Sequence, residues 1–423
     1  MIRSKYSLGK RGSIFSVSPF IVIFFGETEM NNCLQKRTWM EIDLDMVEHN
    51  YNTIRNHVPK STNVCCTIKA DAYGHGAVRI GKLLDELGGF FFAVSNAEEA
   101  IQLRRAGIMK PIMVLGYSPL EITDALAKYN ISQCVHSYEY GKALAEDAKA
   151  KGVKLAIHVK IDTGMGRIGF PFRGHEEDAR LDEIVELCAE DCFVPEGIFT
   201  HFPISDDQKK GEAFTRAQYE KFDSVIKRLE ARGISFPVKH CANSAGLVDY
   251  PEYSLDMVRA GVLFFGILPS TEMKNLDFDL KHTFSLKTVV SNLKTVYAGE
   301  SISYSRLFVA DRTMKVATLP IGYADGFRRS NGSKEMKLYV KGKPCDILGR
   351  VCMDQTMIDV SDIDDISIGD EITVFGKDSP VSVYDYSELH GTIPHEIMCN
   401  IAMRVPRVYF RHGKLDSVLD NLV

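Results

Sequence analysis

The chain has 423 residues, a net charge of −5, and hydrophobic and charged fractions of 45% and 25%. This length favours two domains over one, and the composition is that of a soluble globular protein. The mildly negative charge argues against a nucleic-acid-binding surface. The 10 cysteines show neither metal-ligand nor compact disulfide spacing, which indicates reduced thiols in a cytosolic protein and no metal site.

The first 37 residues form a separate segment. Basic residues precede an apolar stretch from Ile14 to Phe25, as in a secretory signal, but no small-residue cleavage site follows it. The stretch is also too short to span a bilayer. We therefore expect residues 1–37 to be a dispensable extension, with Met30 or Met40 as the working start, and no stable membrane association. An export signal is the alternative.

Between residues 63 and 266, short β-branched runs alternate with longer segments whose apolar residues recur at helical spacing. Eight strands are expected, at 63–69, 90–95, 111–116, 131–136, 154–162, 194–201, 237–242 and 257–266. The helical segments between them include 98–106, 139–151, 177–188 and 211–232. Eight such units predict an α/β fold with a parallel (β/α)8 barrel of the TIM type over residues 38–280.

From about Lys281 the pattern changes to short strands separated by Gly, Asp and Pro turns. These strands are expected at 284–297, 302–309, 315–320, 337–340, 345–351, 356–360, 371–375 and 406–411. The sequence therefore predicts a mainly β C-terminal domain over residues 281–423.

Lys69 directly follows an apolar run, so it lies where a buried strand ends. A lysine in that position is partly desolvated, which lowers its pKa and frees the neutral amine for attack on a carbonyl. Tyr73 is close enough to present its ring and hydroxyl to a bound cofactor, and Gly74 and Gly76 allow a tight turn. The alternative is a lysine whose amine simply reaches solvent.

Other polar residues also lie at or just beyond the ends of predicted strands, where barrel enzymes carry their active residues. They are Arg167, His201, Ser244, Arg259 and Gly261.

The octapeptide 69–76, Lys-Ala-Asp-Ala-Tyr-Gly-His-Gly, resembles the pyridoxal-phosphate attachment signature of bacterial alanine racemases. The likeness extends from about Thr38 to Arg411, and further matching segments occur in the family's order at 160–169, 200–202, 240–245, 321–326 and 352–355. It implies a cytoplasmic, pyridoxal-phosphate-dependent isomerase that supplies D-alanine for peptidoglycan. It also implies that a first strand near 39–44 joins the β domain.

The resemblance implies two bases on opposite faces of the substrate, Lys69 and Tyr304 of the partner subunit. A tyrosine is a weak base at neutral pH and needs cationic or hydrogen-bonding neighbours, for which His201 and Arg259 are the candidates. An ordinary cross-strand tyrosine is the alternative for Tyr304.

Further contacts to the cofactor follow from the same resemblance. Arg259 is similar to the arginine that faces the pyridine nitrogen, and because a guanidinium only donates, it would keep that nitrogen unprotonated. The remaining cofactor-binding residues are expected to be Tyr73, His201, Asn243, Ser244, Gly261 and Val262. The last four offer a hydroxyl, a helix N-terminus and amides to the phosphate, although Asn243-Ser244 is also a common helix cap.

Arg167 resembles the arginine that reaches the substrate carboxylate, and Lys160 aligns with a lysine that family members often carbamylate. Met353 and Asp354 match a loop of the partner subunit that meets the same carboxylate. The resemblance thus implies a homodimer whose two sites are each built from both chains.

Two positions depart from the family pattern. Ser305 stands where a glycine is usual, and Met403 replaces a tyrosine that reaches the phosphate and narrows the pocket mouth. A flexible methionine without a donor leaves the substrate open between alanine and serine, so a serine or broad-specificity racemase is the alternative. A basic amino-acid decarboxylase is less favoured, because no glycine-rich phosphate loop precedes the eighth strand. A non-catalytic carrier would lack the β domain.

Overall fold

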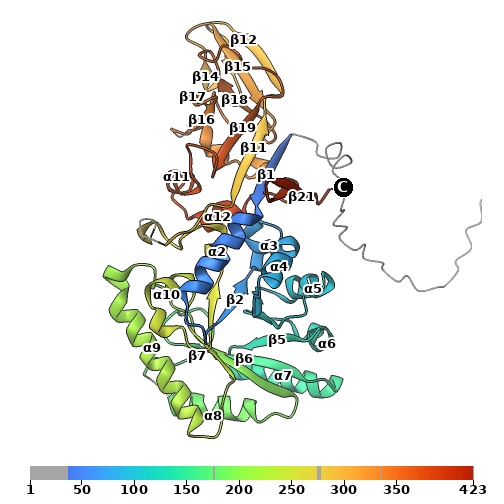
Figure 1. The fold of residues 1–423 in the computed structure, drawn as a ribbon, viewed down its shortest axis with the longest axis vertical. Coiled ribbons are helices and arrows are strands. Elements are labelled where there is room, and N and C mark those ends of the chain that lie inside the picture. The colour runs from blue at the N-terminus through green and yellow to red at the C-terminus, as the bar shows by residue number, and fades with distance from the viewer. Residues whose placement is uncertain (1–36, 175–176, 274–277, 334, 423) are drawn as a thin grey trace, which may run out of the picture.

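The computed structural model describes residues 37–174, 177–273, 278–333 and 335–422. The expected extension over residues 1–37 therefore lies outside the described residues, apart from Arg37. A barrel occupies the lower part of the molecule and a β-rich body the upper part (Figure 1). No helix in the described part of the chain is long and apolar enough to cross a membrane.

Eight parallel strands form the barrel, and most of their residues are buried because helices cover the outer face. They are β2 (Asn63–Thr67), β3 (Phe91–Val94), β4 (Ile112–Val114), β5 (Ile131–Val135), β6 (Leu155–Asp162), β8 (Phe193–Phe199), β9 (Val238–His240) and β10 (Met257–Ala260). They pair in chain order, and β10 returns to β2. The amides of Asp256 and Arg259 donate to Lys239 and Ala242 across the remaining seam. The predicted TIM-type barrel is confirmed.

Helices connect these strands. They are α3 (Lys69–Gly74), α4 (Ala77–Glu86), α5 (Ala97–Arg105), α6 (Thr123–Lys128), α7 (Tyr138–Lys151), α8 (Glu177–Cys188), α9 (Gln208–Glu230) and α10 (Ser244–Asp249). The expected strand 257–266 is too long, because Val262–Phe265 forms a 3₁₀ helix that ends at left-handed Gly266. An apolar run of this length does not by itself distinguish a strand from a buried turn of helix.

The upper body is mainly β, as predicted. Its largest sheet has the order β19-β11-β1-β20-β21, in which β1 (Thr38–Asp43) lies antiparallel to β11 (Phe284–Val289) and parallel to β20 (Arg407–Arg411). The first strand thus joins the last part of the chain, and α2 (Leu44–His57), capped by Asp43, leads from it toward the barrel. The other two strands of this sheet are β19 (Glu371–Gly376) and β21 (Lys414–Leu419).

Smaller sheets complete this body. Their strands are β12 (Asn292–Val296), β13 (Ser301–Ile302), β14 (Phe308–Val309), β15 (Met314–Leu319), β16 (Lys337–Val340), β17 (Lys343–Asp346) and β18 (Thr356–Asp359). The expected continuous strands 284–297 and 302–309 are wrong. The first is two strands, β11 and β12, and the second is interrupted by a 3₁₀ helix at Tyr304–Arg306. Helices α11 (Val383–Leu389) and α12 (Pro394–Cys399) were not predicted.

A left-handed turn follows β2. Residues Ala70 to Tyr73 all have φ between 52° and 54°, a conformation that costs a non-glycine residue about 1–2 kcal/mol. Contacts from the far end of the chain hold the turn in place. Buried Arg407 donates from Nε to Gly74 O (2.9 Å), and Tyr409 Oη donates to His75 O (2.8 Å). The β body therefore fixes the loop that begins at Lys69.

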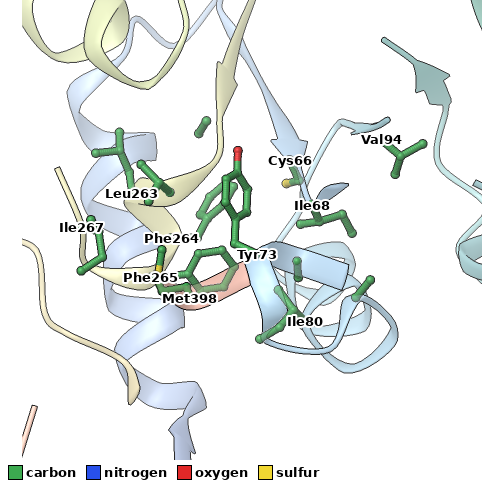
Figure 2. Packing of buried hydrophobic residues seen from close by; sticks show 14 of the residues in the cluster. Cys66, Ile68, Tyr73, Ile80, Val94, Leu263, Phe264, Phe265, Ile267 and Met398 are labelled. Atoms are coloured by element: carbon green, nitrogen blue, oxygen red, sulfur yellow. The ribbon is translucent and has the colours of Figure 1, made fainter. Parts of the chain in front are cut away.

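Apolar side chains also pack against this turn. The Tyr73 ring lies among Phe264, Phe265 and Met398, and its hydroxyl points away from them (Figure 2). Its ring centroid is 5.8 Å from that of Phe265. The barrel, the 3₁₀ helix and α12 thus share one core around this tyrosine.

Gly76→Ala should destabilise the fold. A Cβ atom on Gly76 would lie 1.9 Å from Tyr409 Oη, and φ is +87°, so strain and overpacking together should cost about 2 kcal/mol or more. Gly107→Ala is the matched control, because Gly107 has φ +96° but open space around it. Chemical denaturation should show a clearly larger loss of unfolding free energy for Gly76→Ala than for Gly107→Ala. Equal losses would contradict the close packing of Tyr409 against this turn.

Candidate active site

Lys69 begins α3 at the carboxyl end of β2. Burial lowers the pKa of Lys69 below its ordinary value, and the nearby Arg167 cation lowers it further. The Glu99 carboxylate braces the turn by accepting hydrogen bonds from the amides of Ala70 and Ser95, each at 2.7 Å. A larger share of the lysine is therefore the neutral, nucleophilic amine at neutral pH.

A cavity of about 470 Å³ opens beside Lys69. Four basic side chains line it, Lys69, Lys160, Arg167 and Arg259, and none of the described residues around it is acidic. The uncharged residues around it include Tyr73, His201, Asn243, Ser244, Gly261 and His395. In the described ranges no group of His, Cys, Asp and Glu side chains could hold a metal ion. Such a cavity suits a small anionic ligand.

Arg259 lies on β10 with its guanidinium buried in the barrel. Nη1 donates to His240 Nδ1 (2.9 Å), and Nη2 donates to the carbonyls of Thr200 (2.8 Å) and Cys241 (3.0 Å). Burial lowers the pKa of Arg259 to about 10, so the group stays cationic at neutral pH. Among the described residues Nε makes no hydrogen bond, and this N–H is available to a ligand in the cavity.

His201 lies just past β8 and lines the same cavity. Burial, reinforced by the Arg259 cation 3.3 Å away at Nη2, lowers the pKa of His201 well below its usual value. The sequence predicts His201 and Arg259 as cationic or hydrogen-bonding neighbours of Tyr304. In the structure Arg259 is the cation, and His201 is a neutral hydrogen-bonding group.

Ser244 and Gly261 are neighbours in the lining of the cavity. The Ser244 hydroxyl accepts a hydrogen bond from the Gly261 amide (3.1 Å). A side chain at Gly261 would meet the Tyr73 hydroxyl, since a Cβ atom there would lie 2.5 Å from it. Asn243 caps α10 through Gly246 N, as the plain helix-cap interpretation expects. Val262 is buried outside the cavity lining.

Three of the predicted site residues lie elsewhere. Tyr304 and Met353 belong to the β body and are 62% and 52% exposed. Asp354 is also exposed and accepts from Arg404 Nη2 at 2.6 Å. Within a single chain none of the three lines the cavity around Lys69.

Two positions depart from the family pattern: Ser305 directly follows Tyr304, and Met403 directly precedes Arg404, the residue that donates to Asp354. Ser305 has φ 64°, a left-handed conformation in which glycine carries no steric cost. Met403 is 62% exposed and does not line the cavity within one chain.

Sequence analysis missed His395, which lines the cavity from the start of α12. Burial and the Lys69 charge lower the pKa of His395 to about 4, so the ring is neutral. Its centroid is 5.9 Å from that of Tyr73. No local signal pointed to it, because α12 itself was not predicted.

Comparison with known proteins gives matches along nearly the whole described chain. Residues 42–269 match the model of the alanine racemase N-terminal domain, and residues 283–409 match that of the C-terminal domain. An alanine racemase of Clostridium tetani is 43% identical over 382 residues, which cover 90% of this chain and 97% of the relative.

Solved structures agree. An alanine racemase of Clostridium difficile 630 superposes with a TM-score of 0.87 at 38% identity, covering 92% of this chain and all of the other. The alanine racemase of Bacillus anthracis with bound L-Ala-P gives 0.86 at 32% identity, covering 92% and 99%. The fold and the basic cavity define a lysine-bearing barrel protein with an attached β domain. Within that class, this chain belongs to the alanine racemase family.

Lys160 should make folding stability depend on pH. It is 2% exposed, and burial lowers the pKa of its amine to about 8. Between that value and the unfolded value near 10.5, the unfolded chain binds more protons, so stability rises with pH. The unfolding free energy of wild type minus that of Lys160→Met should increase by about 2 kcal/mol from pH 7.5 to 10.

Denaturation at fixed protein concentration, in buffer free of carbon dioxide, measures this difference. Lys154→Met is the control, because Lys154 is exposed just before β6. If the unfolding free energies of wild type and Lys160→Met changed equally with pH, the lowered pKa of Lys160 would be contradicted.

Proposed function

We propose that this protein is an alanine racemase that interconverts L- and D-alanine with bound pyridoxal phosphate. The basic cavity around a lysine with a lowered pKa carries the proposal. The Clostridium tetani relative is named an alanine racemase and matches over 97% of its length. The Bacillus anthracis relative binds L-Ala-P in a structure that superposes along most of this chain.

The residues around the cavity fit this cofactor. The Ser244 hydroxyl accepts from the Gly261 amide and keeps its own O–H to donate to a phosphate, and the free Nε–H of Arg259 offers a donor to a ring nitrogen. Lys69 supplies the amine for covalent attachment, and Tyr73 borders the same space. When bound, pyridoxal phosphate supplies a conjugated electron sink that makes the α-proton of an amino acid acidic enough for a side-chain base.

Two side chains then handle the proton. Lys69 Nζ serves one face of the α-carbon, and its lowered pKa keeps a neutral amine available. Tyr304 of the partner subunit serves the opposite face. Proton removal on one face and return on the other inverts the configuration. In the dimer the neutral His201 and the cationic Arg259 are the neighbours that would stabilise the Tyr304 phenolate.

Arg167 binds the substrate carboxylate from within the cavity, and Met353 and Asp354 of the partner subunit complete that contact. Lys160 lies beside Arg167 and is partly neutral near pH 8. A neutral amine reacts with carbon dioxide, so we propose that Lys160 is carbamylated and places a negative charge next to Arg167.

We propose a homodimer in the cytoplasm. Its support is on the β body, where Tyr304, Leu307 and Met353 present large apolar surfaces to solvent in a single chain. The two segments that carry them meet where the Ser303 hydroxyl contacts Cys352 Sγ. The nine described cysteines are free thiols, which suits a reducing compartment.

Serine racemisation is the second candidate, and Met403 favours it. A methionine lacks the hydroxyl that a tyrosine would present and can move aside for a larger substrate. In this reading the same machinery acts on a hydroxymethyl side chain, so the two candidates differ only in substrate preference.

An assay of L-alanine, L-serine and L-lysine with added cofactor tests the proposal. We expect fast formation of D-alanine, slower D-serine and no release of carbon dioxide from lysine. Lys69→Ala should lose the cofactor's visible absorbance and nearly all turnover, because attachment and one base disappear together. A kcat/KM for serine above that for alanine would favour the second candidate. Turnover by Lys69→Ala would remove this lysine from the mechanism.

Mixing two inactive variants tests the shared site. Lys69→Ala and Tyr304→Phe should each lose about 10² or more in kcat. After joint refolding, half of the dimers are mixed, and each mixed dimer holds one site with both bases intact. About a quarter of wild-type activity should therefore return. Mixed samples that stay inactive would mean that Tyr304 serves its own chain, and a Tyr304→Phe variant that is active by itself would remove Tyr304 from the mechanism.

A further inference from the structure

A line of polar side chains crosses the barrel interior from Arg259 toward the opposite end. Arg259 Nη1 contacts His240 Nδ1 (2.9 Å), His240 Nε2 contacts His158 Nδ1 (3.0 Å), and His158 Nε2 contacts a Glu196 carboxylate oxygen (2.9 Å). The Ser132 hydroxyl donates to the same oxygen at 2.5 Å. Both histidines are fully buried, whereas the Glu196 side chain is 27% exposed.

Chemistry fixes the direction of every hydrogen bond in this line. A guanidinium can only donate, so His240 Nδ1 must accept and the proton of this neutral ring must be on Nε2. That proton can only be donated to His158 Nδ1, which leaves the His158 proton on Nε2. The line therefore needs an acceptor at its far end, and Glu196 provides it.

The backbone is shaped to bring Glu196 to this position. Along β8, Pro195 pairs with Ile157 of β6 and Gly197 pairs with His158, so Glu196 is the extra residue of a β-bulge. Bulges redirect a side chain out of the regular alternation. Gly197 then makes room for the ring, since a Cβ atom there would lie 2.3 Å from His158 Nδ1.

The surroundings of the two histidines are apolar. His240 stacks on Phe199 with ring centroids 4.9 Å apart, and Phe91 meets His158 edge-on at 5.5 Å. An N–H without an acceptor would be costly here, because little else in these walls can accept it. Loss of the terminal acceptor would thus act on the whole line, up to Arg259.

We propose that Glu196, supported by Ser132, is a positioning residue that fixes the tautomers of His158 and His240 and thereby the orientation of Arg259 in the cavity. This inference rests on the proposed racemase function, in which Arg259 faces the cofactor ring. Glu196 touches neither substrate nor cofactor and acts only through the two histidines.

Two substitutions of Glu196 distinguish the role of its acceptor oxygen from the role of its negative charge. Glu196→Gln keeps a carbonyl oxygen for His158 and should retain kcat within about threefold of wild type. Glu196→Leu removes the acceptor and should lower kcat in both directions by about tenfold or more, with weaker cofactor binding. KM for alanine should change little, because Arg167 is untouched. Glu190→Leu is the control, since Glu190 is paired with Lys142 and Lys149 just before β8.

A spectroscopic readout distinguishes positioning from mere stability. Nitrogen-15 NMR of the histidine rings, recorded on the full chain without added cofactor, should show His158 and His240 of wild type protonated only at Nε2. His158→Asn and His240→Asn assign the signals. Glu196→Leu should populate the other tautomers, whereas Glu196→Gln and Glu190→Leu should not.

A wild-type His158 protonated at Nδ1 or at both nitrogens would overturn the proposal, even if Glu196→Leu fails to fold. A folded Glu196→Leu with wild-type kcat and wild-type tautomers would also overturn it. A wild-type chain that shows the expected tautomers but racemises no amino acid would instead refute the proposed function. The assigned protonation of His158 and His240 at Nε2 would then still hold.

Discussion

Arg259 is a buried cation whose hydrogen-bond partners among the described residues are all uncharged. Its positive charge is therefore not neutralised locally, and it acts on every titratable group nearby. Burial lowers the pKa values of Lys69, Lys160 and His201, and the Arg259 charge lowers all three further. Burial and the cations of Arg167 and Arg259 thus keep a nearby imidazole neutral and two amines closer to neutrality, while the cavity remains attractive to an anion. The lowered pKa of Lys69 and the positive charge of the cavity therefore share part of their origin.

The cavity also depends on contacts between the two bodies of the molecule. The barrel supplies most of the lining, but His395 comes from α12, and the turn after Lys69 is held by Arg407 and Tyr409. The strain of four left-handed residues persists because backbone carbonyls of that turn have fixed donors in the β body. Reactivity at Lys69 is thus a property of the joined bodies rather than of the barrel alone.

The barrel could be predicted from the sequence because its strands are short, apolar and regularly spaced, and because helices such as Glu177–Cys188 have a clear apolar face. The β body was harder. The apolar run 284–297 conceals a break between two strands, and Tyr304–Arg306 turns where alternation suggested a strand.

The site residues at strand ends could be predicted because a parallel barrel brings those ends together. His395 could not, since nothing local connects α12 with Lys69. The bulge at Glu196 was also beyond prediction, because it depends on the register between β6 and β8.

The bracing of the turn has a consequence for how the protein is made. The donor that holds Gly74 O is 333 residues further along the chain, and at about 10 residues per second a ribosome needs roughly half a minute to synthesise that interval. β1 must likewise wait for β20. A nascent chain therefore carries a barrel whose reactive loop lacks the contacts of Arg407 and Tyr409 until translation is nearly complete. Chains that terminate before Arg407 lack both contacts to the turn that begins at Lys69.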